Sequence, residues 1–158
     1  MAAVASSAGT ETGREIVVTR VIEARRQVVF DAFTDPVRLG RWWGPNGSRV
    51  TTHSFDFRPG GIWDATIHRP NGAEYPSRIE WSEIVPPERI VWIYGAKGDP
   101  QAVITTLTLI DRGATTEATL RLLFSSEAER EKAAKHHAVE GARYALEQLT
   151  RFAQEDKR

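Results

Sequence analysis

The sequence predicts an α+β domain in which one antiparallel sheet curves around a long C-terminal helix. Segments rich in β-branched and aromatic residues follow one another from residue 50 to residue 124. Tight turns join these segments with no helical stretch between them, so consecutive strands should pair antiparallel. One long amphipathic segment then closes the chain. Because only that helix is long, we expect one face of the sheet to be packed and the other to face water.

The boundaries of these elements follow from local signals. Asp35 and Pro36 end one short helix and cap the next. Asn71-Gly72 is typical of a hairpin turn, and Pro86-Pro87 interrupts a strand. Ser126 is a suitable helix cap. The predicted elements are a strand at 15–22, helices at 25–34 and 36–42, strands at 50–57, 62–68, 75–85, 89–94, 102–110 and 115–124, and a single helix at 126–154.

The composition limits the classes of partner. The chain has 158 residues, enough for one domain with a substantial core. Lys plus Arg and Asp plus Glu both number 21, so its balanced charge favours neither nucleic acid nor an anionic membrane as partner. The absence of cysteine excludes disulfides, thiolate metal sites and a cysteine nucleophile.

The first residues are small and polar and lack the pattern of a secretory signal. No segment has the apolar length needed to span a bilayer. We therefore expect a disordered tail at 1–13, a single domain at 14–155, and a soluble cytoplasmic protein that is a monomer or a homodimer.

Strict alternation along the strands predicts which side chains face inward. It places His53 beside Phe55, and Glu83 beside Trp81, on the inner face. Burial of either ionisable group requires a hydrogen-bond partner or a wet cavity, so both also have a purely structural interpretation. On the long helix the pattern places Gly141 in the middle of the buried stripe, where glycine would permit a close approach.

An inward set of aromatic residues with a polar minority is typical of a small-molecule pocket. The predicted lining of a ligand cavity consists of His53, Phe55, Trp63, Trp81, Glu83, Trp92 and Tyr144.

Signals for catalysis and for cofactors are weak. His136 and His137 are adjacent on a predicted helix and point about 100° apart, so they cannot chelate one metal ion together. The sequence contains no Gly-x-Ser-x-Gly motif. His53 with Glu83 is the one pair considered for acid–base work. We therefore predict no catalytic residue, no metal and no cofactor.

Several strings occur in a distinctive order, namely Trp-Trp-Gly-Pro at 42–45, Phe-Arg-Pro-Gly-Gly at 57–61, Pro-Asn-Gly at 70–72 and Glu-Ile-Val-Pro-Pro-Glu-Arg-Ile at 83–90. Together they resemble the SRPBCC (START-like) superfamily and, within it, the family named for the activator of the ATPase of heat-shock protein 90. The resemblance covers about residues 15–152. It implies the helix-grip fold, like that of the birch pollen allergen, with a cavity between the sheet and the long helix.

The leading hypothesis is a non-catalytic domain that binds a small apolar or lipid-like ligand in that cavity. Two alternatives stay open, since members of one fold family differ in function. One is a cochaperone-like module whose partner is a chaperone. The other is an enzyme of the cyclase or dehydratase type that uses His53 and Glu83.

Overall fold

The computed structural model describes residues 6–7, 13–95 and 99–155. The tail predicted at 1–13 lies mostly outside these described residues. Within it, Ser6–Ser7 form a short strand, β1, that pairs antiparallel with Val17 and Val18.

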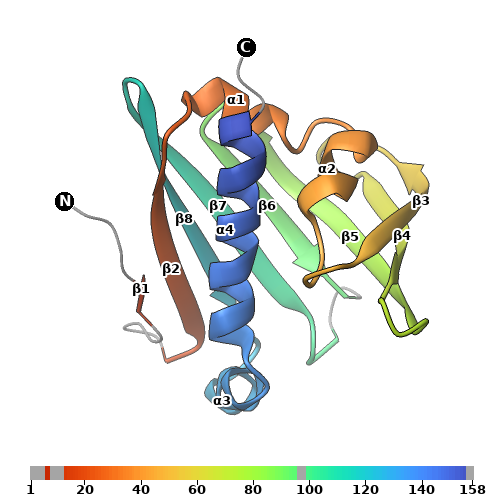
Figure 1. The fold of residues 1–158 in the computed structure, drawn as a ribbon. Helices are drawn as coiled ribbons and strands as arrows, with labels where there is room; N and C mark the ends of the chain where they lie inside the picture. The colour runs from red at the N-terminus through yellow and green to blue at the C-terminus, as the bar shows by residue number, and fades with distance from the viewer. Residues whose placement is uncertain (1–5, 8–12, 96–98, 156–158) are drawn as a thin grey trace.

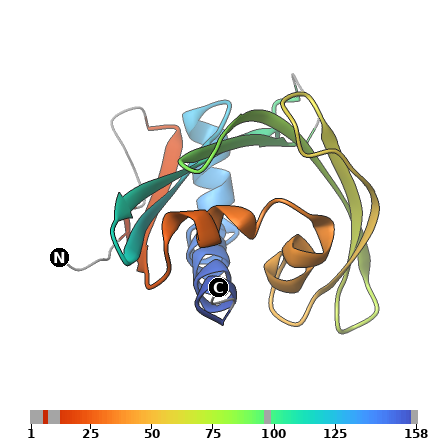
Figure 2. The same ribbon diagram turned by 90° about the horizontal axis from the view of Figure 1, so that it is seen from above.

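The predicted antiparallel sheet is confirmed. Its strands lie in the order β1-β2-β8-β7-β6-β5-β4-β3, and each neighbouring pair is antiparallel. After β1, the strands are β2 (Glu15–Ile22), β3 (Arg49–Phe55), β4 (Ile62–His68), β5 (Glu74–Val85), β6 (Arg89–Tyr94), β7 (Val103–Arg112) and β8 (Thr115–Leu123). Figure 2 looks down the long helix and shows the sheet curving around it.

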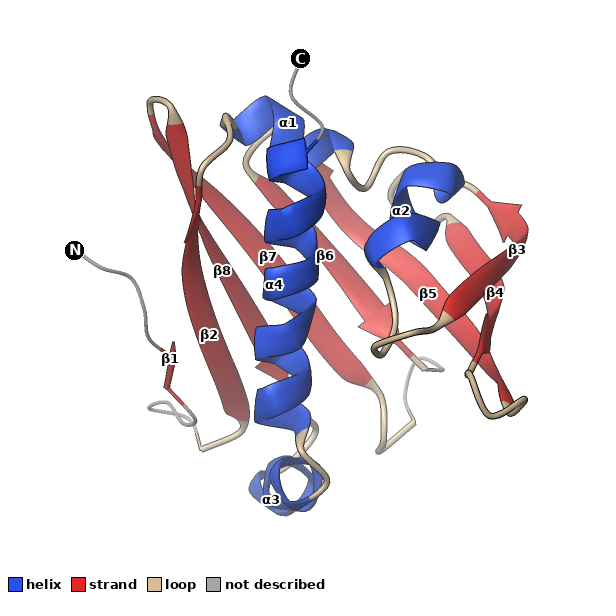
Figure 3. Cartoon of the chain, viewed as in Figure 1, coloured by secondary structure: helices blue, strands red, loops and turns tan. Residues whose placement is uncertain are grey.

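The helices of the described chain are α1 (Arg26–Asp31), α2 (Pro36–Trp42), α3 (Glu127–Lys135) and α4 (Ala138–Glu155). Helix α4 crosses the concave face of the sheet, and α2 lies beside it (Figures 1 and 3). As predicted, Asp35 caps α2, because its Oδ1 accepts a hydrogen bond of 2.9 Å from the Arg38 amide. The cap fixes where α2 begins and therefore which of its side chains face α4.

The prediction of one unbroken helix at 126–154 is wrong. The predicted Ser126 cap is present and starts α3, but the chain turns at His136 and His137, and α4 is a separate helix. His137 has φ 70, in the left-handed region. The break follows from composition, since α3 buries none of its side chains whereas α4 presents a buried apolar stripe. In Figure 1, α3 is seen end-on below α4.

The predicted close approach at Gly141 is also wrong. Gly141 is exposed, and a Cβ placed on it would meet no atom within 4 Å apart from its chain neighbours and the nearby backbone of its own helix. The buried side of α4 instead carries Ala142, Leu146 and Leu149. The stripe is therefore offset from the predicted one, because α4 begins anew after the break.

Two β-bulges decide which side chains reach the core. In β3 the register slips between Thr52 and Ser54, which leaves His53 as an extra residue. Thr52 and Phe55 therefore both face the core although they are three residues apart, and His53 is exposed. Side chains along a strand alternate between the two faces of the sheet. A bulge adds one residue to the strand, so every side chain after it lies on the face opposite to the one that alternation from the residues before it predicts.

The bulge in β5 has the same effect. Its register slips between Trp81 and Glu83, so Trp81 and Ile84 pack against the core while Glu83 lies on the outer face with its strand partner Val91. The predicted inward placement of His53 and of Glu83 is therefore wrong, and a bulge causes each error.

Candidate functional site

Four of the predicted lining residues meet in one aromatic cluster on the concave face. Trp63 and Trp81 are buried and stack with ring centroids 6.4 Å apart. Trp81 packs edge-on against Trp92 at 6.0 Å, and Phe55 lies 6.1 Å from Trp63. These rings pack against one another, so they form a solid wall.

The other three predicted residues lie elsewhere. His53 Nε2 is 2.7 Å from Thr66 Oγ1. Both carboxylate oxygens of Glu83 accept hydrogen bonds from Arg89, at 3.0 and 2.9 Å, and this bonding holds the pKa of Glu83 below its usual value. Tyr144 is half-buried on α4. His53 and Glu83 thus do not form an acid–base pair, because each has a different partner.

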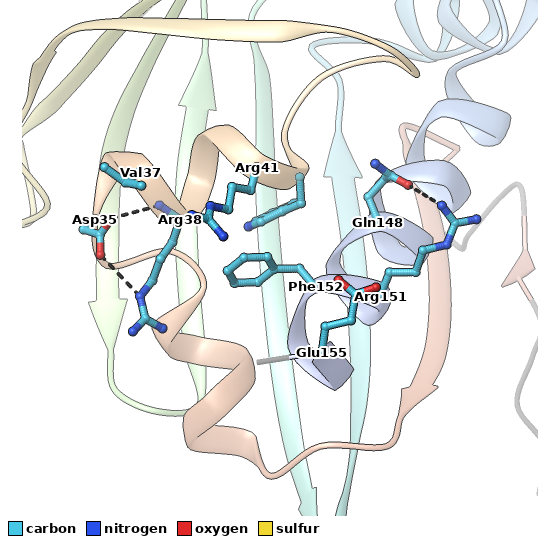
Figure 4. A pocket seen from close by; sticks show the side chains of 9 residues that line it. Asp35, Val37, Arg38, Arg41, Gln148, Arg151, Phe152 and Glu155 are labelled. Carbon is cyan, nitrogen blue, oxygen red and sulfur yellow. Dashed lines mark hydrogen bonds and ion pairs between the residues drawn. The ribbon is translucent and has the colours of Figure 1, made fainter. Parts of the chain in front are cut away.

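A pocket of about 560 Å³ lies between α2 and the C-terminal half of α4. Figure 4 shows the ring of Phe152 directed from α4 toward α2, where Arg41 and the Asp35–Arg38 pair lie. The lining residues are Asp35, Val37, Arg38, Arg41, Trp42, Gln148, Arg151, Phe152 and Glu155.

Helical periodicity brings these side chains together. The α4 residues of the lining occupy positions 148, 151, 152 and 155, a spacing that places them on one face of the helix. On α2, the Asp35 cap and positions 38 and 41 are spaced by three, so they also share a face. The pocket is the space between these two helix faces.

The charges that line the pocket are unevenly paired. Arg38 Nε lies 3.3 Å from Asp35 Oδ2. Arg151 contacts Glu147 at 3.4 Å and donates to Gln148 Oε1 at 3.2 Å. Within the described ranges, Arg41 and Glu155 have no ion-pair partner. The pocket therefore offers one guanidinium and one carboxylate to a ligand.

Trp42 supplies a rigid apolar wall. It is 5 % exposed, and its Nε1 donates to the carbonyl of Ala32 at 3.1 Å. Its ring centroid lies 4.9 Å from the ring centroid of Phe33 and 5.4 Å from that of Trp43. The ring centroids of Trp43 and Trp63 are 5.0 Å apart. A ring-to-ring chain thus connects the pocket to the aromatic cluster.

Sequence reasoning missed this site, since none of the seven predicted lining residues belongs to the pocket. A signal was present in the spacing of Gln148, Arg151 and Phe152 on the predicted helix, although Glu155 lies one residue beyond its predicted end. What was absent was any indication that this face meets α2, which lies more than a hundred residues earlier in the chain.

With this geometry in place, comparison with known proteins decides the family. The model of the Activator of Hsp90 ATPase homolog 1-like protein family matches residues 23–154. The chain belongs to this family. The resemblance inferred from the motifs is thereby confirmed, and with it the helix-grip-like fold. No curated protein matches the sequence.

Solved structures of similar proteins share the fold. A protein from Arthrobacter aurescens has 24% identity over 96% of this chain and 92% of its own, with a TM-score of 0.86. Protein CV1439 from Chromobacterium violaceum has 26% identity over 86% of this chain and 94% of its own, with a TM-score of 0.71. The AHSA1-like protein from Aeromonas hydrophila has 15% identity over 89% of this chain and 92% of its own, with a TM-score of 0.70.

Two further findings concern only the part of the chain that the structure describes. No group of three or more His, Asp or Glu side chains there is arranged to hold a metal ion. No helix in those residues has both the length and the apolar character to cross a bilayer.

Proposed function

We propose that this member of the family is a small-molecule binding domain whose ligand is a compact organic anion, held between α2 and α4. The single observation that carries the proposal is the pocket of about 560 Å³ in which Arg41 has no ion-pair partner among the described residues. Pockets of roughly 300–1,000 Å³ suit drug-sized ligands. The proposal retains the small-molecule binding domain of the leading sequence hypothesis, but its ligand is an anion and not a purely apolar molecule.

The guanidinium of Arg41 supports the choice of an anion. A guanidinium offers a planar set of donors that matches a carboxylate or a phosphate. Arg38 and Arg151 lie in the same lining, and their bonds to Asp35 and to Glu147 hold them in place. The Glu155 carboxylate, which lines the pocket from α4, repels an anion, so it restricts where the charged end of a ligand can lie.

The aromatic side chains support an apolar body for the ligand. Phe152 and Trp42 line the pocket, and aromatic rings there suit a small ring or a short chain. In this proposal the predicted residues Phe55, Trp63, Trp81 and Trp92 serve as the packed wall behind Trp42. Their contribution to binding is rigidity, which lowers the cost of ordering the pocket.

The test is a titration of aryl and short alkyl carboxylates, each matched with its neutral amide, followed by calorimetry and tryptophan fluorescence. We expect the carboxylates to bind and the amides to bind more weakly. Arg41→Gln should weaken carboxylate binding by roughly tenfold, the loss of a charged hydrogen bond. Glu155→Gln should strengthen it, because a repelling charge is removed.

The matched control is Arg78→Gln. Arg78 is an exposed arginine on the outer face of β5, opposite Asp64 of β4, and its loss should leave the affinity unchanged. The two pocket variants must shift the carboxylate affinity in opposite directions while the amides stay constant. Equal effects of Arg41→Gln and Arg78→Gln, or no binding of any carboxylate, would contradict the proposal.

A further inference from the structure

A hydroxyl, an imidazole and a carboxylate form a hydrogen-bonded chain on the outer face of the sheet, away from the pocket. Thr51 Oγ1 of β3 lies 2.7 Å from His68 Nε2 of β4. His68 Nδ1 lies 3.1 Å from Glu74 Oε2 of β5. We call these three residues the outer relay. The side chain of His68 is 19% exposed and that of Glu74 is 62% exposed.

Strand register places the outer relay. His68 and Glu74 are direct partners across β4 and β5, and a tight hairpin joins them, closed by the bond from the Arg69 amide to the Ala73 carbonyl at 2.8 Å. Thr51 pairs with Thr66, so its hydroxyl reaches His68 diagonally across β3 and β4. Diagonal neighbours on one face of a sheet lie within reach of long side chains.

The carboxylate settles the roles of the two imidazole nitrogens. An ionised Glu74 only accepts hydrogen bonds, so Nδ1 of His68 must carry the proton that is donated to it. In the neutral ring, Nε2 is then the acceptor, and Thr51 donates its hydroxyl proton to it. A hydroxyl that donates to an imidazole oriented by a carboxylate is the arrangement of an activated nucleophile.

From these contacts we propose that Thr51 is a nucleophile toward small activated esters. Its Oγ1 forms a bond to the acyl carbon while its proton passes to His68 Nε2. The bond from the acyl carbon to the alcohol oxygen breaks, and the leaving alkoxide takes the proton from Nε2. The products are an acyl ester on Thr51 and a free alcohol. Water then bonds to the acyl carbon and gives a proton to Nε2, the bond from the acyl carbon to Thr51 Oγ1 breaks, and Oγ1 takes that proton back, so that a carboxylic acid leaves and the Thr51 hydroxyl is restored.

Arg49 is placed to stabilise the negative charge that develops on the acyl oxygen. It is exposed, it precedes Thr51 by two residues on the same face of β3, and its direct strand partner is His68. Within the described residues it has no ion-pair partner. A cation beside the reacting carbonyl contributes electrostatic stabilisation.

The same face contains a built-in comparison. His53 Nε2 lies 2.7 Å from Thr66 Oγ1, the same separation as in the outer relay. In the part of the chain that the structure describes, however, His53 has no carboxylate on its other nitrogen. Nothing there selects its tautomer, so Thr66 should not be activated.

The experiment follows release of p-nitrophenolate from p-nitrophenyl acetate and locates the acetyl group by peptide mass mapping. We expect acetylation at Thr51. His68→Gln should reduce its rate by about a hundredfold, which is the lower end of the contribution that a general base makes. Thr51→Val should abolish the adduct, and Thr51→Ser should retain it because the hydroxyl is kept. Thr66→Val is the matched control and should acetylate as the unaltered protein does.

Glu74→Gln tests the orienting role with a readout other than rate. The glutamine amide can donate to Nδ1, which moves the ring proton to Nε2, and nitrogen NMR of His68 detects that change. Acetylation should fall together with the tautomer shift. Labelling spread over Thr66 and other hydroxyls, an adduct that forms equally well in His68→Gln, or no adduct at all would each overturn the proposal. These outcomes leave carboxylate binding by the α2–α4 pocket untouched, so the two proposals fail separately.

Discussion

Glu83 illustrates how one inserted residue changes the chemistry of a side chain. Alternation placed it on the inner face, where a carboxylate would need a cavity or a partner. The bulge in β5 turns it outward, where both of its oxygens bond to Arg89. Its charged form is therefore stabilised, and its pKa lies below the usual value chiefly because of that hydrogen bonding.

This shift predicts a pH dependence of stability with a definite sign. Because the folded pKa of Glu83 is lower than the unfolded one, the unfolded state binds more protons in the acid range. The contribution of Glu83 is therefore present above the unfolded pKa and is lost as the pH falls through the folded pKa. Thermal unfolding of Glu83→Gln and of the unaltered protein should differ near neutral pH and converge in acid. A difference that grows on acidification would contradict the assignment.

The break between α3 and α4 shows how an element ends where its burial pattern changes. Helix α3 is capped by Ser126 and has no fully buried side chain, and it is tied to the rest of the fold by Ala133, which packs against a small apolar cluster, and by Arg130, whose Nε donates to the Gly13 carbonyl at 2.8 Å. Helix α4 buries Leu146 and Leu149 against the sheet. His137 joins the two helices with φ 70, a conformation that glycine adopts more readily.

Two glycine substitutions follow from this geometry. Gly141→Ala should stabilise the protein by about 1 kcal/mol, because position 141 is helical, exposed and has open space around it. His137→Gly should also stabilise it, since the positive φ is strained for a residue with a side chain. Each gain should raise the melting temperature by roughly 2–4 °C. A large loss in Gly141→Ala would mean that the buried stripe passes through position 141 after all.

One continuous core connects the sheet to α1, α2 and α4. It contains Val29 of α1, Leu39 of α2 and Leu146 of α4 beside Trp63 and Trp81 of the sheet. All five tryptophans of the chain belong to this core or pack against it. The pocket wall and the aromatic cluster are thus parts of one packed unit.

The continuity of the core predicts cooperative unfolding. Tryptophan fluorescence and far-ultraviolet circular dichroism should give coincident denaturation curves, the behaviour of a two-state domain. Trp81→Ala removes a fully buried ring and should lower the free energy of unfolding by about 3–5 kcal/mol, with both curves shifted together. Val37→Ala, an exposed residue of α2, is the control and should shift neither. Two separate transitions in the unaltered protein would show that the sheet and the helices are distinct units.

Local chemistry determined the elements. The turn at Asn71-Gly72, the caps Asp35 and Ser126 and the runs of β-branched residues predicted the order of strands and helices, because each signal acts within a few residues. The inward tryptophans were also predictable, since alternation holds wherever a strand is regular.

Tertiary structure decided the rest. The bulges at His53 and Ser82 depend on how neighbouring strands pair, and they reversed the facing of His53 and Glu83. The pocket needs α2 and α4 to meet, and the outer relay needs three strands in one register. Such pairings depend on contacts between distant segments, which no local pattern encodes.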